Sequence, residues 1–190
     1  PVKLIGLFHV AHEKELDIHP QALRLITQNL KRINGPFRKT EEANRLFMEI
    51  LTSRRDPETA LKRMNEAGVL GRFIPDFGRI VAQVQHDMYH VYTVDEHSLI
   101  GVRELELLRD GELAADSPML TQIMRQCAKP KLVYLAMMFH DLGKGYGGDH
   151  DERGAVMVRD IGVRLGLDAG DRQALEFLVR HHILMSKLAQ

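Results

Sequence analysis

The sequence is poor in several features, and each scarcity excludes a class of protein. It holds one cysteine, Cys127, so it can form no intrachain disulfide and suits a reducing compartment. Its longest apolar run, 132–139, is far shorter than the roughly 18 residues of a membrane-spanning helix. Neither charge is in excess, because 26 Lys and Arg balance 26 Asp and Glu, whereas a general nucleic-acid binder usually needs a basic surplus. We therefore expect a cytoplasmic protein that binds neither nucleic acid nor membranes.

Signals for β-strands are also lacking, which points to the fold class. Period-two alternation of apolar and polar residues is absent, whereas apolar residues recur at helical spacing along the whole sequence. The 190 residues, 44% of them hydrophobic, can bury the core of one domain with a helical extension. The chain begins Pro1-Val2-Lys3, with neither an initiator methionine nor a signal-peptide pattern, so we expect part of a longer protein. We predict an all-α fold.

Residues 1–75 carry ordinary amphipathic patterns and no cluster of chemically active side chains. An apolar stripe that follows Pro20 is broken by Gly35-Pro36, and another stripe succeeds it. Asp56-Pro57 predicts a helix start, with Asp as N-cap and Pro at the first helical position, and Gly68 predicts its end. We predict that 1–75 form a helical linker or support region.

Residues 76–190 are expected to form a second helical region, which is rich in histidine. Thr93 to Glu96 have the spacing of a capping box, in which the Thr hydroxyl binds a backbone N–H, and predict a helix to about Asp110. Pro130 begins a helix that is apolar on almost every side and therefore buried.

Two more helices are predicted near the end of the chain. The first starts at the acidic stretch 149–152 and ends near Gly166. The second carries Leu175, Val179 and His182 on one face.

The dipeptide His-Asp occurs three times, as His86-Asp87, His140-Asp141 and His150-Asp151. Context singles out His140-Asp141, because it ends the most apolar helix and a loop follows it directly. Two polar residues at such a place are costly to bury unless something binds them. A divalent cation suits imidazole and carboxylate ligands, and a helix C-terminus favours positive charge. His97, one turn into the capped helix, is a third candidate ligand.

Simpler interpretations remain open for each residue. A single His or Asp at a helix end is usually a cap or a satisfied polar group in the core. His86-Asp87 fits a solvated loop. The early histidines lack a partner pattern, and we expect structural or surface roles for these three: His9, His12 and His19.

His97 followed by His140-Asp141 and a Gly-Lys loop resembles the HD phosphohydrolase superfamily. The surrounding strings are more specific, and they are similar to the HD domain and the preceding helical stretch of bacterial bifunctional PII uridylyltransferase/uridylyl-removing enzymes. These strings are 46–51 (LFMEIL), 63–65 (RMN), 68–75 (GVLGRFIP), 90–97 (HVYTVDEH), 139–145 (FHDLGKG), 147–150 (GGDH) and 184–186 (LMS). The resemblance spans nearly the whole chain and implies an HD helical bundle over 76–190.

The resemblance also implies a set of site residues. The family binds divalent metal through residues matching His97, His140 and Asp141, and through a later Asp that would lie beyond Gln190. The resemblance therefore implies three ligands and an open position here, and an inactive site is an expected outcome for these 190 residues alone. Mn or Mg is the expected metal, with Fe, Co or Zn as alternatives. In members with two metals, further histidines match His150 and His182, and the adjacent His181 is an alternative.

The implied reaction is hydrolysis of the uridylyl-tyrosine phosphodiester on the PII signal protein, which makes uridylylated PII the expected partner. Asp141, His140, Lys144 and His150 are the candidate catalytic residues, with Lys144 meeting a phosphate oxygen as a point charge. Two alternatives remain: another HD hydrolase, such as a guanosine-tetraphosphate hydrolase, and a non-catalytic helical module between domains.

Overall fold

The computed structural model describes residues 2–84, 92–146 and 148–188, except for the side chains of 185 and 186. Within these ranges the chain is helical and contains no strand, so the predicted all-α fold is confirmed. The helices are α1 Lys3–Glu13, α2 Pro20–Gln28, η1 Leu30–Arg32, α3 Gly35–Arg38, α4 Glu41–Leu51, α5 Pro57–Glu66, α6 Val69–Phe73, α7 Pro75–Ile80, α8 Val94–Asp110, α9 Pro118–Gln126, α10 Pro130–Phe139, η2 Leu142–Tyr146, α11 His150–Arg164, α12 Ala169–Arg180 and α13 Leu184–Leu188. No helix among the described residues is long and apolar enough to cross a membrane.

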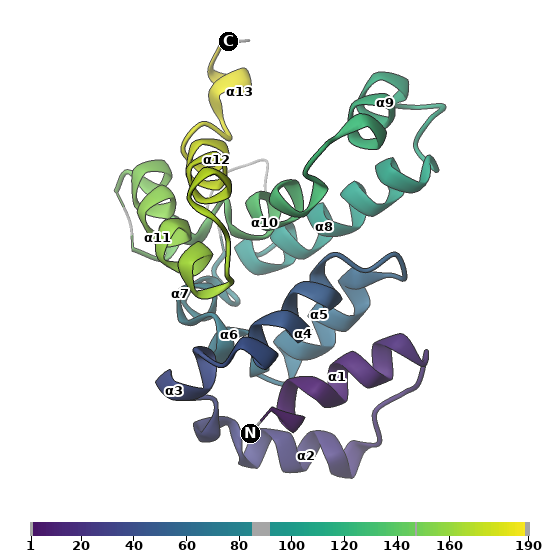
Figure 1. Ribbon diagram of the computed structural model, residues 1–190, viewed down its shortest axis with the longest axis vertical. Coiled ribbons are helices and arrows are strands. Elements are labelled where there is room, and N and C mark those ends of the chain that lie inside the picture. Colours follow the sequence, from purple (N-terminus) through teal and green to yellow (C-terminus); the bar gives the residue numbers. More distant parts are fainter. Residues whose placement is uncertain (1, 85–91, 147, 189–190) are drawn as a thin grey trace.

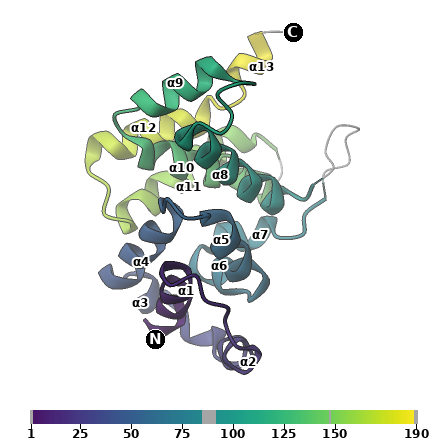
Figure 2. The same cartoon turned by 90° about the vertical axis from the view of Figure 1, so that its right-hand side faces the viewer.

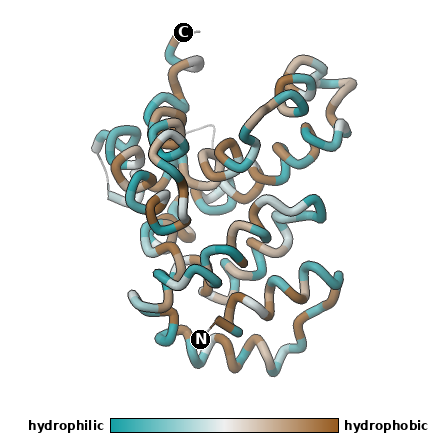
Figure 3. Tube along the Cα trace, viewed as in Figure 1, coloured by the Kyte–Doolittle hydropathy of each residue, from teal (hydrophilic) through white to brown (hydrophobic). Residues whose placement is uncertain are grey.

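The helices form two halves that share one hydrophobic core. In Figure 1, α1 to α7 make up the lower half and α8 to α13 the upper half, with the two ends of the chain at opposite poles. Figure 2 shows the same division after a quarter turn. Hydrophobic and hydrophilic residues alternate along the helices in Figure 3, as expected when each helix buries one face.

Several predicted helix boundaries are confirmed. Asp56 precedes α5 and its carboxylate accepts the Thr59 N–H, with Pro57 in the first turn. α10 starts at Pro130 and its central residues are buried, including Leu135 and Met138. α8 ends at Asp110, where Gly111 takes a positive φ that closes the helix.

Three details differ from the sequence expectations. Gly35-Pro36 opens the short helix α3 rather than only breaking a stripe, because the Asn34 side chain caps it by accepting the Phe37 N–H. Thr93 precedes α8 as predicted, but its side chain makes no capping hydrogen bond. α12 ends at Arg180, so His182 lies beyond the helix rather than on its face.

Polar side chains join the two halves across the shared core. Arg164 of α11 donates hydrogen bonds to the Arg38 carbonyl oxygen and to Asn44 Oδ1, each with a donor–acceptor distance of 3.1 Å. Its guanidinium also lies 4.6 Å from the ring centre of Phe73. Glu106 of α8 accepts a hydrogen bond from the Asp56 backbone N–H at a distance of 2.7 Å. These contacts hold α8 and α11, which carry candidate site residues, on the first half of the chain.

Candidate metal centre

Four helix ends converge in the second half of the chain, and together they bring five of the predicted residues. His97 lies in the first turns of α8, His140 and Asp141 follow α10, His150 begins α11, and His182 follows α12. The imidazole rings lie side by side, with centroids 5.2 Å apart for His97 and His140, 5.0 Å for His140 and His182, and 5.8 Å for His150 and His182. Residues up to 85 positions apart in the sequence are thus gathered into one cluster.

The cluster divides into two groups of potential metal ligands that share Asp141. One group is His97, His140 and Asp141, and the other is Asp141, His150 and His182. Within each group the ligand atoms lie within 4.8 Å of one another. Because Asp141 has two carboxylate oxygens, it can serve both groups at once. These are the five residues that the sequence analysis named as metal ligands.

The same kind of hydrogen bond orients two of the imidazole rings. His140 Nδ1 lies 2.8 Å from the Met137 carbonyl oxygen, and His182 Nδ1 lies 2.7 Å from the Val179 carbonyl oxygen. Each carbonyl comes three residues earlier, where a helix end leaves it without an intrahelical partner. When Nδ1 donates its proton to that carbonyl, Nε2 is left to face the cluster.

Asp141 is buried, and positive or polar groups surround its carboxylate. Oδ2 accepts a hydrogen bond from Lys144 Nζ over 2.7 Å and lies 3.2 Å from His140 Nε2, while Oδ1 lies 3.6 Å from His182 Nε2. Burial alone would raise the pKa of Asp141, but its contacts with His140, His182 and Lys144 outweigh burial and hold this pKa far below its ordinary value. The carboxylate is therefore ionised at every pH at which the protein would work.

The loop after Asp141 is fixed against both halves of the chain. Lys144, for which the sequence analysis proposed a phosphate contact, is here paired with Asp141. Its carbonyl oxygen accepts a hydrogen bond from Gln83 Nε2 over 3.1 Å. Gly143 passes so close to α11 that a Cβ atom there would overlap the carbonyl group of His150.

The start of α8 is held by a contact that the sequence analysis missed. Asp95 is buried and accepts hydrogen bonds from Asn65 Nδ2 over 2.7 Å and from the Ala82 N–H over 3.1 Å. Since Asn65 belongs to α5, the first half of the chain positions the helix that carries His97. An Asp in the first turn of a helix usually indicates only a favourable dipole interaction, so this role of Asp95 has no local signal in the sequence.

The remaining candidates lie elsewhere. His181 is exposed, its ring lies 4.6 Å from that of Phe177, and it belongs to neither group of potential metal ligands. Asp171 is buried in ion pairs with Lys129 and Lys131, at 2.6 and 2.9 Å. His86-Asp87 falls outside the described residues.

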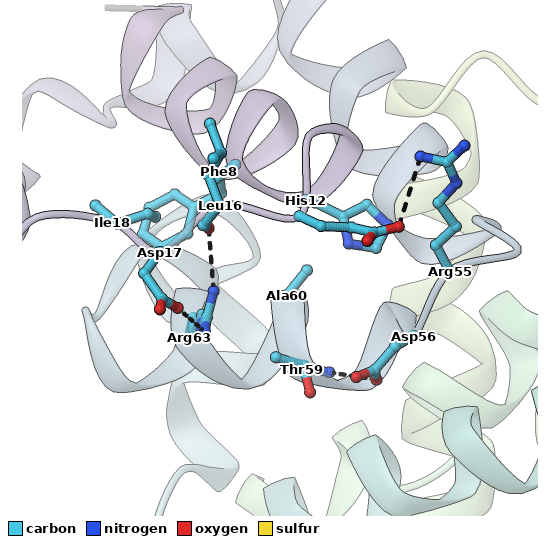
Figure 4. A pocket seen from close by; sticks show the side chains of 12 residues that line it. Phe8, His12, Leu16, Asp17, Ile18, Arg55, Asp56, Thr59, Ala60 and Arg63 are labelled. Atoms are coloured by element: carbon cyan, nitrogen blue, oxygen red, sulfur yellow. Dashed lines mark hydrogen bonds and ion pairs between the residues drawn. The ribbon is translucent and has the colours of Figure 1, made fainter.

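The early histidines have the structural surroundings expected of them. His9 Nε2 lies 2.9 Å from Glu49, and His19 Nδ1 accepts the Gln21 N–H at the start of α2. His12 borders a hollow of about 210 Å³ between the end of α1 and the start of α5, shown in Figure 4. The charged side chains of this hollow pair with each other, as Arg63 does with Asp17 over 2.6 Å, and no group of potential metal ligands gathers there among the described residues.

The two ligand groups fit a divalent cation on their own chemistry. Asp141 Oδ1 is buried and makes no hydrogen bond, although an anionic oxygen in that position is costly to leave without a partner. Two imidazoles and a carboxylate per group are ligands that Mn, Fe, Co and Zn accept, and shared carboxylates are usual where two cations lie close together. HD domains bind divalent metals; which metal suits this chain stays a prediction.

Comparison with known proteins agrees with this architecture. The family described as HD domain matches residues 94–189, and the family described as Uridylyltransferase GlnD third domain matches residues 1–73. The chain therefore belongs to the HD domain family, and its first 73 residues are similar to the GlnD third domain. The two matches end and begin on either side of the predicted boundary at 75/76, which itself stays a prediction.

Three curated relatives are similar over the whole chain. They are bifunctional uridylyltransferase/uridylyl-removing enzymes from Azospirillum brasilense (49% identical over 189 residues), Novosphingobium aromaticivorans (47%) and Rhodospirillum rubrum (48%). Each alignment covers 100% of this chain but only 20 to 21% of the relative. The chain thus spans about a fifth of the length of these enzymes.

Cation binding is expected to weaken as the pH falls from about 8 to about 6. Burial alone would lower the pKa of His182, but the Asp141 carboxylate and the Val179 carbonyl outweigh it, so this pKa lies above its ordinary value. The imidazole then holds a proton at pH 6 that a cation must displace, whereas at pH 8 less of it is protonated. Titration calorimetry with Mn in buffers of different ionisation enthalpy measures both the affinity and the protons released.

A matched pair of variants tests the role of His182 in this pH dependence. His182→Gln should remove part of the proton release, whereas His181→Gln changes an exposed imidazole next to it and should leave the release unchanged. An affinity that stays constant between these pH values would show that no imidazole proton competes with the cation.

Proposed function

We propose that this chain hydrolyses the phosphodiester between a uridylyl group and a tyrosine of the PII signal protein, in a reaction that requires a divalent cation, Mn or Mg. The observation that carries the proposal is the buried Asp141 shared between two groups of imidazole ligands. Its chemical context comes from relatives that are named uridylyl-removing enzymes and match the chain from end to end.

The proposed roles follow from the positions of the side chains. His97, His140 and Asp141 would hold one cation, while Asp141, His150 and His182 would hold a second. When bound, a divalent cation lowers the pKa of a ligated water and offsets negative charge on a phosphate. Lys144, paired with Asp141, keeps this carboxylate in place, and its ammonium can turn toward a phosphate oxygen once a cation neutralises Asp141.

The leaving group decides how much acid catalysis the site needs. A tyrosine phenol has a pKa of about 10, so the phenolate can leave without prior protonation. Stabilisation of charge on the phosphate and correct placement of the water therefore matter more than a strong general acid. His150 and His182 meet this need as cation ligands, which is why we assign them no proton transfer.

The experiment that tests the proposal measures UMP release from uridylylated PII with Mn, with Mg and after removal of metal by a chelator. Uridine 5′-(p-nitrophenyl phosphate) is assayed in parallel. It is also an aryl phosphodiester that releases a phenolate, and its hydrolysis does not depend on docking of PII. Release that requires Mn or Mg and stops with the chelator is expected. Absence of metal-dependent release from both compounds would contradict the proposal and favour a non-catalytic module.

The same assay tests whether the chain is a guanosine-tetraphosphate hydrolase instead. Guanosine tetraphosphate is offered at equal concentration, and its pyrophosphate is measured as product. A preference for this nucleotide over both uridylyl esters would assign the site to a nucleotide hydrolase instead.

A further inference from the structure

Asp151 has an unusual environment for a residue in the first turn of a helix. It is buried, and its Oδ1 makes no hydrogen bond. That oxygen lies 2.8 Å from His150 Nε2 and 3.9 Å from His182 Nε2. Its Oδ2 lies 3.4 Å from Lys187 Nζ, and the Lys187 side chain is 63% exposed. The two histidines carry a charge only when they are protonated, and the lysine is screened by solvent. A buried carboxylate with such partners is costly unless a further cation neutralises it.

The surroundings of Asp151 repeat those of Asp141. Both carboxylates have an Oδ1 that is buried and without a hydrogen bond, and both of these oxygens face His182 Nε2, at 3.6 Å for Asp141 and 3.9 Å for Asp151. The difference lies in the other oxygen: Asp141 Oδ2 has Lys144 and His140 as close partners, whereas Asp151 Oδ2 has the exposed Lys187. Of the two carboxylates, Asp151 therefore has the greater need for a bound cation.

We propose that Asp151 is a direct ligand of the second cation, together with Asp141, His150 and His182. This inference rests on the proposed function, because it assumes that the ligand groups hold cations. A second carboxylate matters for two reasons. It adds a negative charge where two dications would otherwise share Asp141 alone, and it gives the second position an oxygen-rich ligand set that suits Mn or Mg better than Zn. Lys187 is the counter-ion that the cation displaces.

The test counts cations bound by the full 190-residue chain and by two variants. Asp151→Asn keeps the shape of the side chain but removes its charge. Asp149→Asn is the matched control: it makes the same charge change two residues earlier, where the side chain is exposed and makes no capping hydrogen bond. Mn binding is followed by calorimetry and by electron paramagnetic resonance, since two Mn ions bridged by Asp141 give a spin-coupled spectrum that a single ion cannot give.

The unmutated chain and Asp149→Asn should each bind two Mn with a coupled spectrum. Asp151→Asn should keep the first Mn, while its affinity for the second falls at least about tenfold, because loss of even an outer-shell partner of a metal ligand costs 10–100-fold. At Mn concentrations that saturate the first position alone, its spectrum should be that of an isolated ion. Far-UV circular dichroism and metal-free melting curves establish that the variant is folded.

Other numbers of bound Mn would contradict one or both proposals. If Asp151→Asn binds two Mn as tightly as the unmutated chain, Asp151 is not a ligand. If the unmutated chain binds only one Mn and Asp151→Asn binds it equally well, this inference is overturned while the proposed hydrolytic site at His97, His140 and Asp141 stands. If neither the unmutated chain nor any variant binds Mn, the proposed metal-dependent function fails as well.

Discussion

Replacing Asp141 by asparagine is expected to lower the rate of metal-dependent UMP release at least about a thousandfold. The carboxylate belongs to both ligand groups, so its loss weakens both cation positions at once. Cation stabilisation of a phosphoryl transition state contributes several kcal/mol, and each 1.36 kcal/mol corresponds to a factor of about ten in rate. A neutral amide oxygen at the same place recovers little of this, because its attraction for a dication is far weaker than that of a carboxylate.

The same substitution is expected to lower the stability of the metal-free chain at neutral pH. The pKa of Asp141 is depressed in the folded chain, so its ionised form stabilises the fold at every pH above the unfolded value, near 4, and this contribution is lost only as the pH falls through the depressed value. At pH 7 it is therefore fully present, and the variant loses it. Rates must be compared below the melting transition of the variant, which circular dichroism defines.

Two further variants make the result interpretable. Asp160→Asn removes the same charge from an exposed position of α11 and should keep the rate of the unmutated chain. His140→Gln removes a ligand of only the first group and should also abolish release. If Asp141→Asn instead hydrolyses the esters at a similar rate, the buried His-Asp pair is structural and the chemistry lies elsewhere.

Local signals in the sequence predicted those parts of the fold that depend on neighbouring residues. Asp56-Pro57 marks the start of α5 because the cap and the proline act within one turn, and the apolar run after Pro130 marks α10 as buried. The pairing of His140 with Asp141 at the end of that helix followed from the same reasoning. His97 was also a candidate third ligand from its place in the first turn of the capped helix. Convergence of His150 and His182 on this pair is tertiary, and it was expected only through the family resemblance.

Residues with two possible roles were the ones that sequence analysis assigned incompletely. Asp151 follows Asp149 in an acidic helix start, a pattern that indicates a cap and a favourable dipole interaction, so its burial against His182 gave no local signal. The Thr93 hydroxyl has the spacing of a capping box but makes no capping bond. Asp95, in the first turn of the same helix, instead binds Asn65 of another helix. Spacing states which contacts are possible, whereas packing decides which of them form.

Replacing Gly143 by alanine is expected to impair both stability and the second cation position. The new Cβ atom would overlap the backbone carbonyl of His150, and backbone atoms cannot turn aside as a flexible side chain does. The loop Leu142–Tyr146 would have to move away from the start of α11, which separates Asp141 from His150. Overpacking of this kind typically costs about 1–3 kcal/mol. For a chain of this size that corresponds to a melting temperature lower by roughly 2–4 °C per kcal/mol.

Gly170→Ala provides the contrast, because a Cβ atom at this helical position would meet only Asp168 Oδ1 at 3.5 Å, an ordinary contact. Alanine there should raise the stability by up to about 1 kcal/mol, since glycine is the weaker helix former. Opposite shifts of the two melting temperatures, with the second Mn weakened only in Gly143→Ala, would show that the approach of this loop to α11 sets the distance between Asp141 and His150. Unchanged melting and Mn binding in Gly143→Ala would mean that the loop can move without cost, so that the two ligands are held by their own helices alone.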